Sequence, residues 1–220
     1  MTPGHDRPPA EPGRDCRLCP RLADFRHANR AAHPDWHNAP VPSFGGLDAR
    51  ILVVGLAPGL KGANRTGRPF TGDYAGNLLY DALTGFGLAR GRYGARADDG
   101  FTLAGARVTN AVRCAPPVNK PLPAEFVACR PFLAAEIAAM PNLSGILAVG
   151  RDAHDAVLAV LGLRKSAHPF AHGRLHRLPG VILADSYHCS RYNTNTGRLT
   201  EAMFHAALGG LIEAVAIPIL

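Results

Sequence analysis

Short apolar runs alternate with helix-length segments along most of this chain. The apolar runs are rich in β-branched residues, as expected of strands buried on both faces. They span residues 51–56, 108–112, 145–149 and 181–184. The helix-length segments carry apolar residues at helical spacing and span residues 75–86, 124–139, 151–161 and 199–215. Because parallel strands need crossover connections, this order predicts an α/β fold: a three-layer α/β/α sandwich with a central, mostly parallel four-stranded sheet.

The length of 220 residues fits one ordinary domain or two very small ones. With 47% hydrophobic and 19% charged residues, the chain can bury a core without disulfides, so one compact domain is expected. Residues 1–15 are rich in proline, glycine and charge, which predicts a flexible N-terminal tail. The sequence has no long apolar stretch and no apolar signal-peptide core, so we expect a cytoplasmic monomer without a membrane partner.

The formal net charge of +7 comes mainly from arginine, since only Lys61, Lys120 and Lys165 among the 24 basic residues are lysines. Guanidinium groups match phosphate oxygens in pairs, which favours a polyanionic partner such as nucleic acid. The abundance of Ala, Gly, Pro and Arg together is also typical of a biased genome. Charge alone therefore leaves a nucleic-acid partner about as plausible as a compositional effect.

The chain has five cysteines, an odd number for a protein expected in a reducing compartment. Cys16 and Cys19 form a C-x-x-C pair that can grip one metal centre, and Cys114 and Cys129 could complete a four-thiolate set. The alternative is an isolated C-x-x-C pair with buried cysteines that behave as small apolar residues. Metal binding is the favoured interpretation.

Polar and glycine residues follow the ends of the predicted strands. The first strand leads into the turn at 55–59, the second carries Asn110 near its end, and the fourth leads into the segment 185–188. Gly150 follows the third strand and opens a helix. Parallel sheets bind ligands outside the carboxyl ends of their strands, so we expect the functional site at this edge.

Three stretches are specific enough to compare with known families: GLAPGLKGANRTGRPFTGDYAGNLLYDAL at 55–83, TNAVRCAPP at 109–117 and HCSRYNTNTGRLT at 188–200. In this order they resemble the iron-sulfur uracil-DNA glycosylases, most closely the b branch, often called family 5. The resemblance runs from Cys16 to about Thr200. It implies that residues 16–220 form one glycosylase domain, which flips uracil out of DNA, hydrolyses its N-glycosidic bond and leaves an abasic site.

The resemblance also implies a pocket for the flipped base. Phe70 stands where the family has its stacking aromatic residue, and Asn110 where it has the asparagine that reads the uracil edge. One amide can accept from uracil N3–H and donate to O4, whereas cytosine reverses that pattern. The turn residues Gly55, Leu56 and Ala57 are expected to contact the substrate, and Asn119 is a second candidate asparagine. The alternatives are core packing for Phe70 and a loop or capping amide for Asn110.

Three residues are the catalytic candidates. His188 opens the last motif, where the family's histidine lies against uracil O2 and takes up negative charge on the departing base. Asp73 could orient or deprotonate water and offset positive charge on the sugar, because this branch lacks a polar residue in its first motif. Asp73 could instead cap the helix that follows it. Asn193 could help to position the water.

The loop that holds the last motif is expected to enter the DNA. Arg191 and Tyr192 are candidates for the wedge that fills the gap left by the flipped nucleotide, and Arg198 and Arg65 for phosphate contacts. The segment 193–197 could also be a simple turn before the last helix. Arg113 and Arg130 are further candidates for contacts with the DNA backbone.

By the same resemblance, Cys16, Cys19, Cys114 and Cys129 would hold a 4Fe-4S cluster with a structural role, and zinc is the alternative metal. One departure from the family is Cys189, which stands where proline usually follows the histidine and puts the rigidity of the loop in doubt. It also leaves open a cysteine hydrolase.

The predicted function is therefore monofunctional excision of uracil, with other deaminated bases as possible further substrates. No lysine falls in the last two motifs, so no amine is at hand there for a lyase step. The alternatives from other classes are a noncatalytic iron-sulfur module that binds or senses damaged DNA, and an electron-transfer protein. The range of bases and the choice between single-stranded and duplex DNA are not encoded in any motif.

Overall fold

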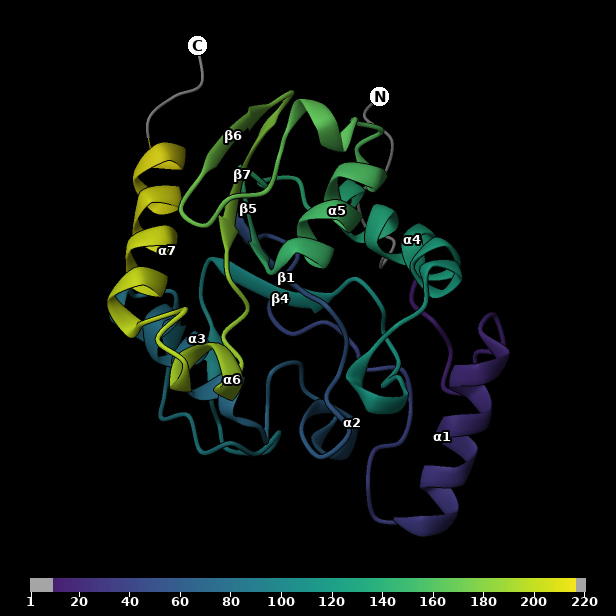
Figure 1. Cartoon of the computed structure of the whole chain (residues 1–220). Coiled ribbons are helices and arrows are strands. Elements are labelled where there is room, and N and C mark those ends of the chain that lie inside the picture. The colour runs from purple at the N-terminus through teal and green to yellow at the C-terminus, as the bar shows by residue number, and fades with distance from the viewer. Residues whose placement is uncertain (1–9, 217–220) are drawn as a thin grey trace, which may run out of the picture.

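Strands and helices alternate along the chain in the computed structural model, which describes residues 10–216 (Figure 1). The strands are β1 (Ile51–Gly55), β2 (Ala89–Arg90), β3 (Thr102–Leu103), β4 (Ala106–Asn110), β5 (Gly145–Val149), β6 (Leu175–Leu178) and β7 (Val181–Ser186). The helices are α1 (Pro20–Ala32), α2 (Ala63–Thr66), α3 (Tyr74–Gly85), α4 (Pro123–Ala138), α5 (Arg151–Val160), α6 (Arg191–Asn195) and α7 (Glu201–Ala216). Short 3-10 turns are η1 (Pro117–Asn119) and η2 (Lys165–Ala167).

The central sheet has five strands in the order β4-β1-β5-β7-β6. β4, β1, β5 and β7 are parallel, and β6 pairs with β7 in the antiparallel direction. The predicted α/β fold with a mostly parallel sheet is confirmed, but the predicted number of four strands is wrong. The missed strand, β6, reads Leu-His-Arg-Leu and buries only alternate residues, so it lacks the continuous apolar run of an interior strand.

Successive residues of the central strands point to opposite faces, so each strand contributes to two cores. Val53 and Leu147 pack with residues of α3 and α7 on one face. Leu52 and Ile146 pack with residues of α4 and α5 on the other face. Figure 1 shows the resulting layers, with α3 and α7 on one side of the sheet and α4 and α5 on the other.

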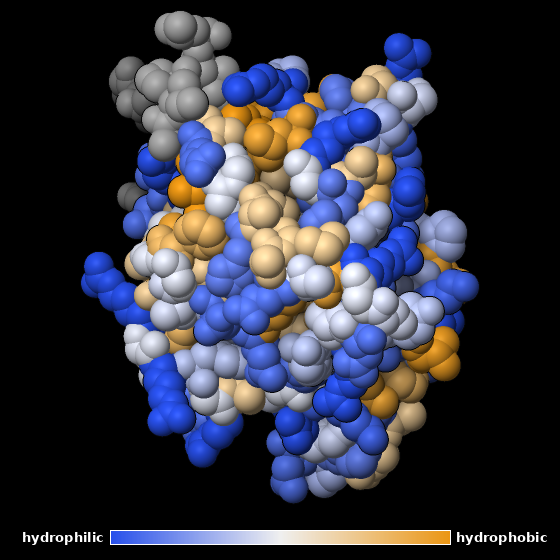
Figure 2. Space-filling view, turned by 60° about the vertical axis from the view of Figure 1, so that its left-hand side comes forward, coloured by the Kyte–Doolittle hydropathy of each residue, from blue (hydrophilic) through white to orange (hydrophobic). Residues whose placement is uncertain are grey.

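Helix α1 lies outside these layers and packs through Leu22 against Val112, Cys114 and Cys129. Residues 1–9 of the predicted flexible tail lie outside the described residues. In the rest of the tail, Asp15 pairs with Arg30 of α1 at 2.6 Å. Among the described residues, no helix combines the length and the apolar character needed to cross a bilayer. Figure 2 shows hydrophilic side chains over much of one face, interrupted by apolar patches.

Candidate active site

A cavity of about 530 Å³ opens at the carboxyl ends of β1, β4 and β7, where parallel-sheet geometry predicts a ligand site. We call it the strand-end cavity. It is lined by Leu56, Ala57, Pro58, Gly59, Ala63, Phe70, Asp73, Tyr74, Ala75, Asn110, Asn119, His188, Ser190 and Arg191. The structure thus brings together Phe70, Asp73, Asn110 and His188, four residues that the sequence analysis took from three separate motifs.

Asn110 and Phe70 lie side by side above Gly55. Gly55 and Asn110 end neighbouring parallel strands and are partners in the register. A β-carbon on Gly55 would lie 2.5 Å from both Asn110 Oδ1 and Phe70 Cζ, so this position has no room for a side chain. Gly55 therefore serves the cavity by leaving space for an amide and an aromatic ring.

Phe70 has a left-handed backbone, with φ of 52°, which is strained for a bulky residue. Two tyrosine hydroxyls bind the backbone of this segment. Tyr80 Oη donates to the Pro69 carbonyl at 2.6 Å, and Tyr93 Oη donates to the Phe70 carbonyl at 3.2 Å. The two rings also contact each other, with centroids 4.7 Å apart. These contacts fix the strained backbone that aims Phe70 into the cavity.

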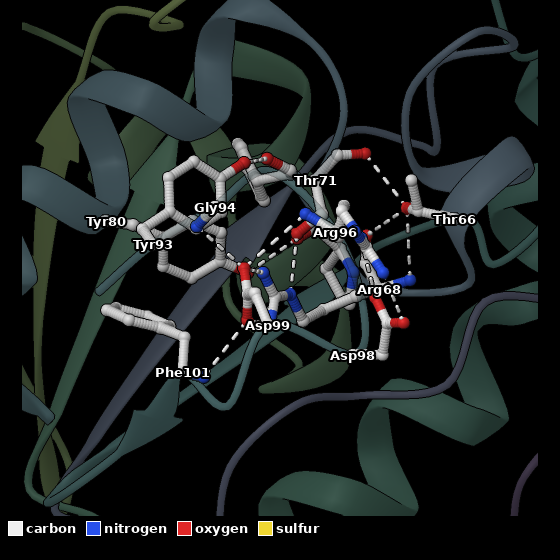
Figure 3. Close-up of polar contacts among 12 residues, drawn as sticks. Thr66, Arg68, Thr71, Tyr80, Tyr93, Gly94, Arg96, Asp98, Asp99 and Phe101 are labelled. Carbon is white, nitrogen blue, oxygen red and sulfur yellow. Dashed lines mark hydrogen bonds and ion pairs between the residues drawn. The ribbon is translucent and has the colours of Figure 1, made fainter. Parts of the chain in front are cut away.

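A buried ion pair, the Arg68–Asp99 clamp, lies beneath the same segment (Figure 3). Arg68 Nη1 and Nη2 donate to the two carboxylate oxygens of Asp99 at 2.8 and 2.7 Å, and its Nε donates to Thr71 Oγ1 at 2.8 Å. Hydrogen bonds from Arg68 hold the pKa of Asp99 well below its usual range, although burial acts in the opposite direction. Four aromatic rings surround the guanidinium with centroids at 5.0–5.8 Å, namely those of Phe44, Tyr80, Tyr93 and Phe101.

Asp73 occupies the N-cap position of α3, but its side chain makes no capping hydrogen bond. Its Oδ1 is buried without a hydrogen-bond partner among the described residues. A β-carbon at position 59 would lie 2.9 Å from Oδ2, so a glycine there makes room for the carboxylate. Burial raises the pKa of Asp73, and the nearby N–H of Gly76, the His188 ring and the nearby N–H of Ala75 partly offset this rise, although neither N–H reaches hydrogen-bonding geometry.

His188 faces the cavity from the segment after β7. Its ring lies 6.3 Å from that of Phe70, centroid to centroid, with 23° between the planes. Burial lowers the pKa of His188, and Asp73 partly offsets that effect. The imidazole is therefore neutral at neutral pH, with one N–H able to donate.

The residues after His188 hold its backbone in place. Asn193 Nδ2 donates to the His188 carbonyl at 2.8 Å, and the Asn193 N–H donates to Ser190 Oγ at 3.3 Å. Asn193 is not among the residues that line the cavity, so its contacts bear on His188 rather than on a water inside. Cys189 is fully buried, and burial raises the pKa of its thiol to about 12. A thiol of that kind anchors the loop and offers no nucleophilic thiolate.

Another buried carboxylate, that of Asp185, lies near the end of β7, three residues before His188. Asp185 accepts from His154 Nδ1 at 2.6 Å, from His176 Nε2 at 2.9 Å and from the Ala171 N–H at 3.1 Å. His154 Nε2 donates to the His168 carbonyl at 2.8 Å. Because the two ring nitrogens of His154 face a carboxylate and a carbonyl oxygen, this arrangement favours the doubly protonated, positively charged ring. Burial lowers the pKa of His154, but Asp185 outweighs it, and the net pKa is raised.

The four candidate DNA-binding residues are all exposed. Arg191 lines the cavity and lies over the Tyr74 ring at 5.5 Å, and Arg198 lies over Tyr187 at 4.7 Å. Tyr192 is 73% exposed, and Arg65 is exposed on α2.

The prediction that Arg113 contacts the DNA backbone is wrong. Arg113 is buried and pairs with Glu136 at 2.6 Å. Arg107 pairs with the other oxygen of the same carboxylate at 2.6 Å. A sequence shows that Arg113 is basic but not that a glutamate 23 positions away neutralises it inside the fold.

Some residues of the cavity wall were not predicted from the sequence. Tyr74 and Ala75 follow Asp73 directly, and Ser190 lies two positions after His188. The available signal for these residues was that they lie close in sequence to Asp73 and His188. The sequence at the start of a helix does not reveal which side chains face a cavity. Asn119, the second candidate asparagine, does line the wall.

The four cysteines of the predicted metal site line one small pocket between α1 and α4. Cys114 and Cys129 are buried, and Cys16 and Cys19 are half-buried. Arg26 Nη1 donates to Cys114 Sγ at 3.6 Å, and the Arg113 N–H donates to Cys129 Sγ at 3.4 Å. Arg26 Nε is buried in the same region without a hydrogen-bond partner among the described residues, so a cation faces this sulfur-lined pocket.

Comparison with known proteins gives a consistent result. The family model described as the uracil DNA glycosylase superfamily matches residues 42–211. A Type-5 uracil-DNA glycosylase of Thermus thermophilus is 51% identical over 196 residues, which are 86% of this chain and 89% of the relative. A Type-5 uracil-DNA glycosylase of Mycobacterium leprae is 44% identical over 86% of each chain. A Type-4 uracil-DNA glycosylase of Thermotoga maritima is 36% identical over 63% of this chain and 58% of the relative.

Proposed function

Because the chain belongs to the uracil DNA glycosylase superfamily, we propose that it is a DNA repair enzyme that hydrolyses the N-glycosidic bond of uracil flipped out of DNA. The product would be an abasic site. The observation that carries this proposal is the convergence of Phe70, Asp73, Asn110 and His188 on one cavity at the carboxyl edge of the sheet. Relatives of Type 5 at 41–51% identity support the predicted resemblance to that branch.

We propose that Phe70 and Asn110 hold the base. The strained, clamped backbone of Phe70 presents a fixed ring face for stacking, so little freedom is lost when the base enters. The Asn110 amide, at the end of a buried strand, can accept from N3–H and donate to O4 of uracil. Leu56 and Ala57 would complete the wall beside the base.

His188 and Asp73 would carry the chemistry. A neutral His188 can donate its N–H to uracil O2, where negative charge grows as the bond breaks. Asp73 keeps one buried carboxylate oxygen unpartnered, which suits it to orient a water and to offset positive charge on the sugar. The contact between Asn193 and the His188 carbonyl would keep the imidazole aimed at the base.

We propose uracil-containing DNA as the partner, bound by the exposed residues Arg65, Arg191, Tyr192 and Arg198, of which Arg191 lines the cavity. The net charge of +7 supports contact with phosphates. We further propose that residues 16–220 act as one glycosylase domain, as a monomer in the cytoplasm, with residues 1–15 as a flexible tail.

The cysteine pocket would hold a 4Fe-4S cluster. No three cysteine sulfurs within the described range lie within 4.8 Å of one another. A tetrahedral zinc site, with Zn–S bonds of about 2.3 Å, brings its sulfurs to about 3.8 Å from one another. The wider spacing favours a cluster in which each iron binds one thiolate, and Arg26 would face its negative charge. Its contribution would be structural, linking α1 to α4 and to the segment after β4.

The test is incubation with a duplex that contains one uracil, followed by alkali to cut abasic sites. Strand cleavage only after alkali supports a monofunctional glycosylase, and folded protein that releases no base contradicts it. Substituting His188→Ala and Asp73→Ala separates the two classes of function. Each variant should lose about 10²–10⁴-fold in rate, whereas a noncatalytic module would be unaffected. Brown colour and iron content, against zinc content, test the cofactor.

A further inference from the structure

The two most exposed large apolar side chains among the described residues are each next in sequence to a residue that lines the strand-end cavity. They are Val118, 90% exposed, and Tyr192, 73% exposed. Val118 is next to Asn119, and Tyr192 is next to Arg191, both of which line the cavity. In Figure 1 the teal-green turn that contains η1 and the helix α6 stand on either side of α2, below the sheet. Each of two separate segments thus carries an exposed apolar side chain next in sequence to a residue that lines the cavity.

The turn that carries Val118 is held in a costly conformation. Val118 has φ of 49° and ψ of 27°, a left-handed backbone that is a true outlier for a β-branched residue. Pro116 and Pro117 precede it, and two hydrogen bonds close the turn: Asn119 N–H to the Pro116 carbonyl at 3.2 Å and Lys120 N–H to the Pro117 carbonyl at 3.1 Å. The chain thus maintains a strained turn that presents two methyl groups to water without burying them. Strain of this kind collects at functional sites.

The chemistry beside the turn points to duplex DNA. The exposed ammonium of Lys120 follows Val118 by two positions, and the guanidinium of Arg191 precedes Tyr192 by one, so each apolar tip stands beside a cation suited to phosphate. When a nucleotide leaves the stack, apolar side chains can enter between the neighbouring base steps and hold the duplex open. A short, rigid valine fits such a step better than a long flexible side chain, because it loses little rotamer freedom.

We propose that Val118 is a second wedge, which enters duplex DNA from the rim of the cavity formed by η1 while Tyr192 enters from the rim formed by α6. This inference rests on the proposed function. Val118 would act by stabilising the opened duplex and would not touch the base that is cleaved. Its effect should therefore be confined to substrates whose uracil must first be unstacked.

The experiment compares Val118→Ala and Val118→Gly with the matched control Val127→Ala, which truncates another exposed valine, on α4 and outside the strand-end cavity. Single-turnover uracil release is measured on a fully paired duplex, on single-stranded DNA and on a duplex whose uracil lies in a mismatched bubble. Both Val118 variants should lose about tenfold or more on the paired duplex and less than about threefold on the unstacked substrates. The control should match wild type on every substrate.

The glycine variant separates a wedge from a structural role. Glycine accepts the left-handed backbone, so Val118→Gly should melt at the same temperature as wild type or higher while it loses activity on paired DNA. Equal losses on paired and unstacked substrates, or no loss on paired DNA, would overturn the inference. If wild type releases uracil only from unstacked DNA, the wedge is overturned and the proposed function stands. Failure of wild type on every substrate would overturn both.

Discussion

Two buried carboxylates support two parts of the cavity, the segment of Phe70 and the strand that leads to His188. They differ in the cation that each one binds. Asp99 binds Arg68 beneath Phe70, whereas Asp185 binds the charged ring of His154 at the strand end before His188. In both pairs the partners lie 31 residues apart in sequence. A guanidinium keeps its charge at all ordinary pH values, but an imidazolium titrates near neutrality. The Phe70 wall is therefore insensitive to pH near neutrality, while the strand that leads to His188 is linked to protonation.

The sign of each linkage follows from the direction of the pKa shift. The pKa of Asp99 is depressed in the folded protein, so its contribution to stability is present above its unfolded pKa of about 3.9 and is lost as the pH falls through the folded value. The pKa of His154 is raised, so its contribution is fully present below about pH 6.5 and is lost as the pH rises through the raised value.

Breaking the arginine pair should have the largest effect. Asp99→Ala leaves the Arg68 guanidinium buried without its carboxylate and should reduce the free energy of unfolding by about 3–5 kcal/mol. Urea denaturation of the purified protein measures this change. Uracil release should fall as well, because the Phe70 backbone loses its support. A loss below about 1 kcal/mol would show that the clamp does not anchor this wall.

Breaking the histidine pair should cost less, because Asn can still fill the position and accept one hydrogen bond. Asp185→Asn should lower the free energy of unfolding by about 1.5–3 kcal/mol, the range for a hydrogen bond to a charged group. It should also lower the pKa of His154, which NMR titration of the ring reports. The exposed carboxylate of Asp152 provides the control: Asp152→Asn should leave that pKa unchanged. An unshifted His154 pKa in Asp185→Asn would contradict the charged pair.

A smaller effect is expected in the pH dependence of the wild-type protein. Its free energy of unfolding should decline as the pH rises above about 6.5, since His154 loses its second proton in the folded state only above its raised pKa. His154→Gln removes the titrating group and should flatten this slope, whereas Asp99→Ala should retain it. Denaturation curves at several pH values decide the point, and a slope shared by all three proteins would refute the assignment.

The smallest effect on stability is expected from a substitution at Asp98, one residue before Asp99 of the clamp. Arg96 and Asp98 form a hydrogen-bonded pair in the same loop, but their side chains are 72% and 70% exposed. Asp98→Ala should leave the free energy of unfolding nearly unchanged, because solvent screens an exposed ion pair. Measured beside Asp99→Ala, it shows whether burial, rather than the presence of an ion pair, distinguishes the clamp.

Some of this molecule could be predicted from sequence because the signal was local. The four predicted strands are continuous apolar runs and the four predicted helices have periodic apolar residues, so both appear in the structure within a few residues of their expected ends. β6 was missed because it buries only alternate residues and has no continuous apolar run. The candidate cavity residues came from motifs, and the parallel sheet explains why residues as distant as Phe70 and His188 line one cavity.

The sequence by itself determined the alternation of strands and helices, the family and the candidate residues Phe70, Asp73, Asn110 and His188, because apolar periodicity and long motifs lie in neighbouring positions of the chain. Only the tertiary structure decided which charges are buried and what they bind: Arg113 turned inward to Glu136, Arg68 to Asp99 and His154 to Asp185. The physical reason is that an ion pair depends on distance and desolvation, and both are properties of segments brought together by the packed core.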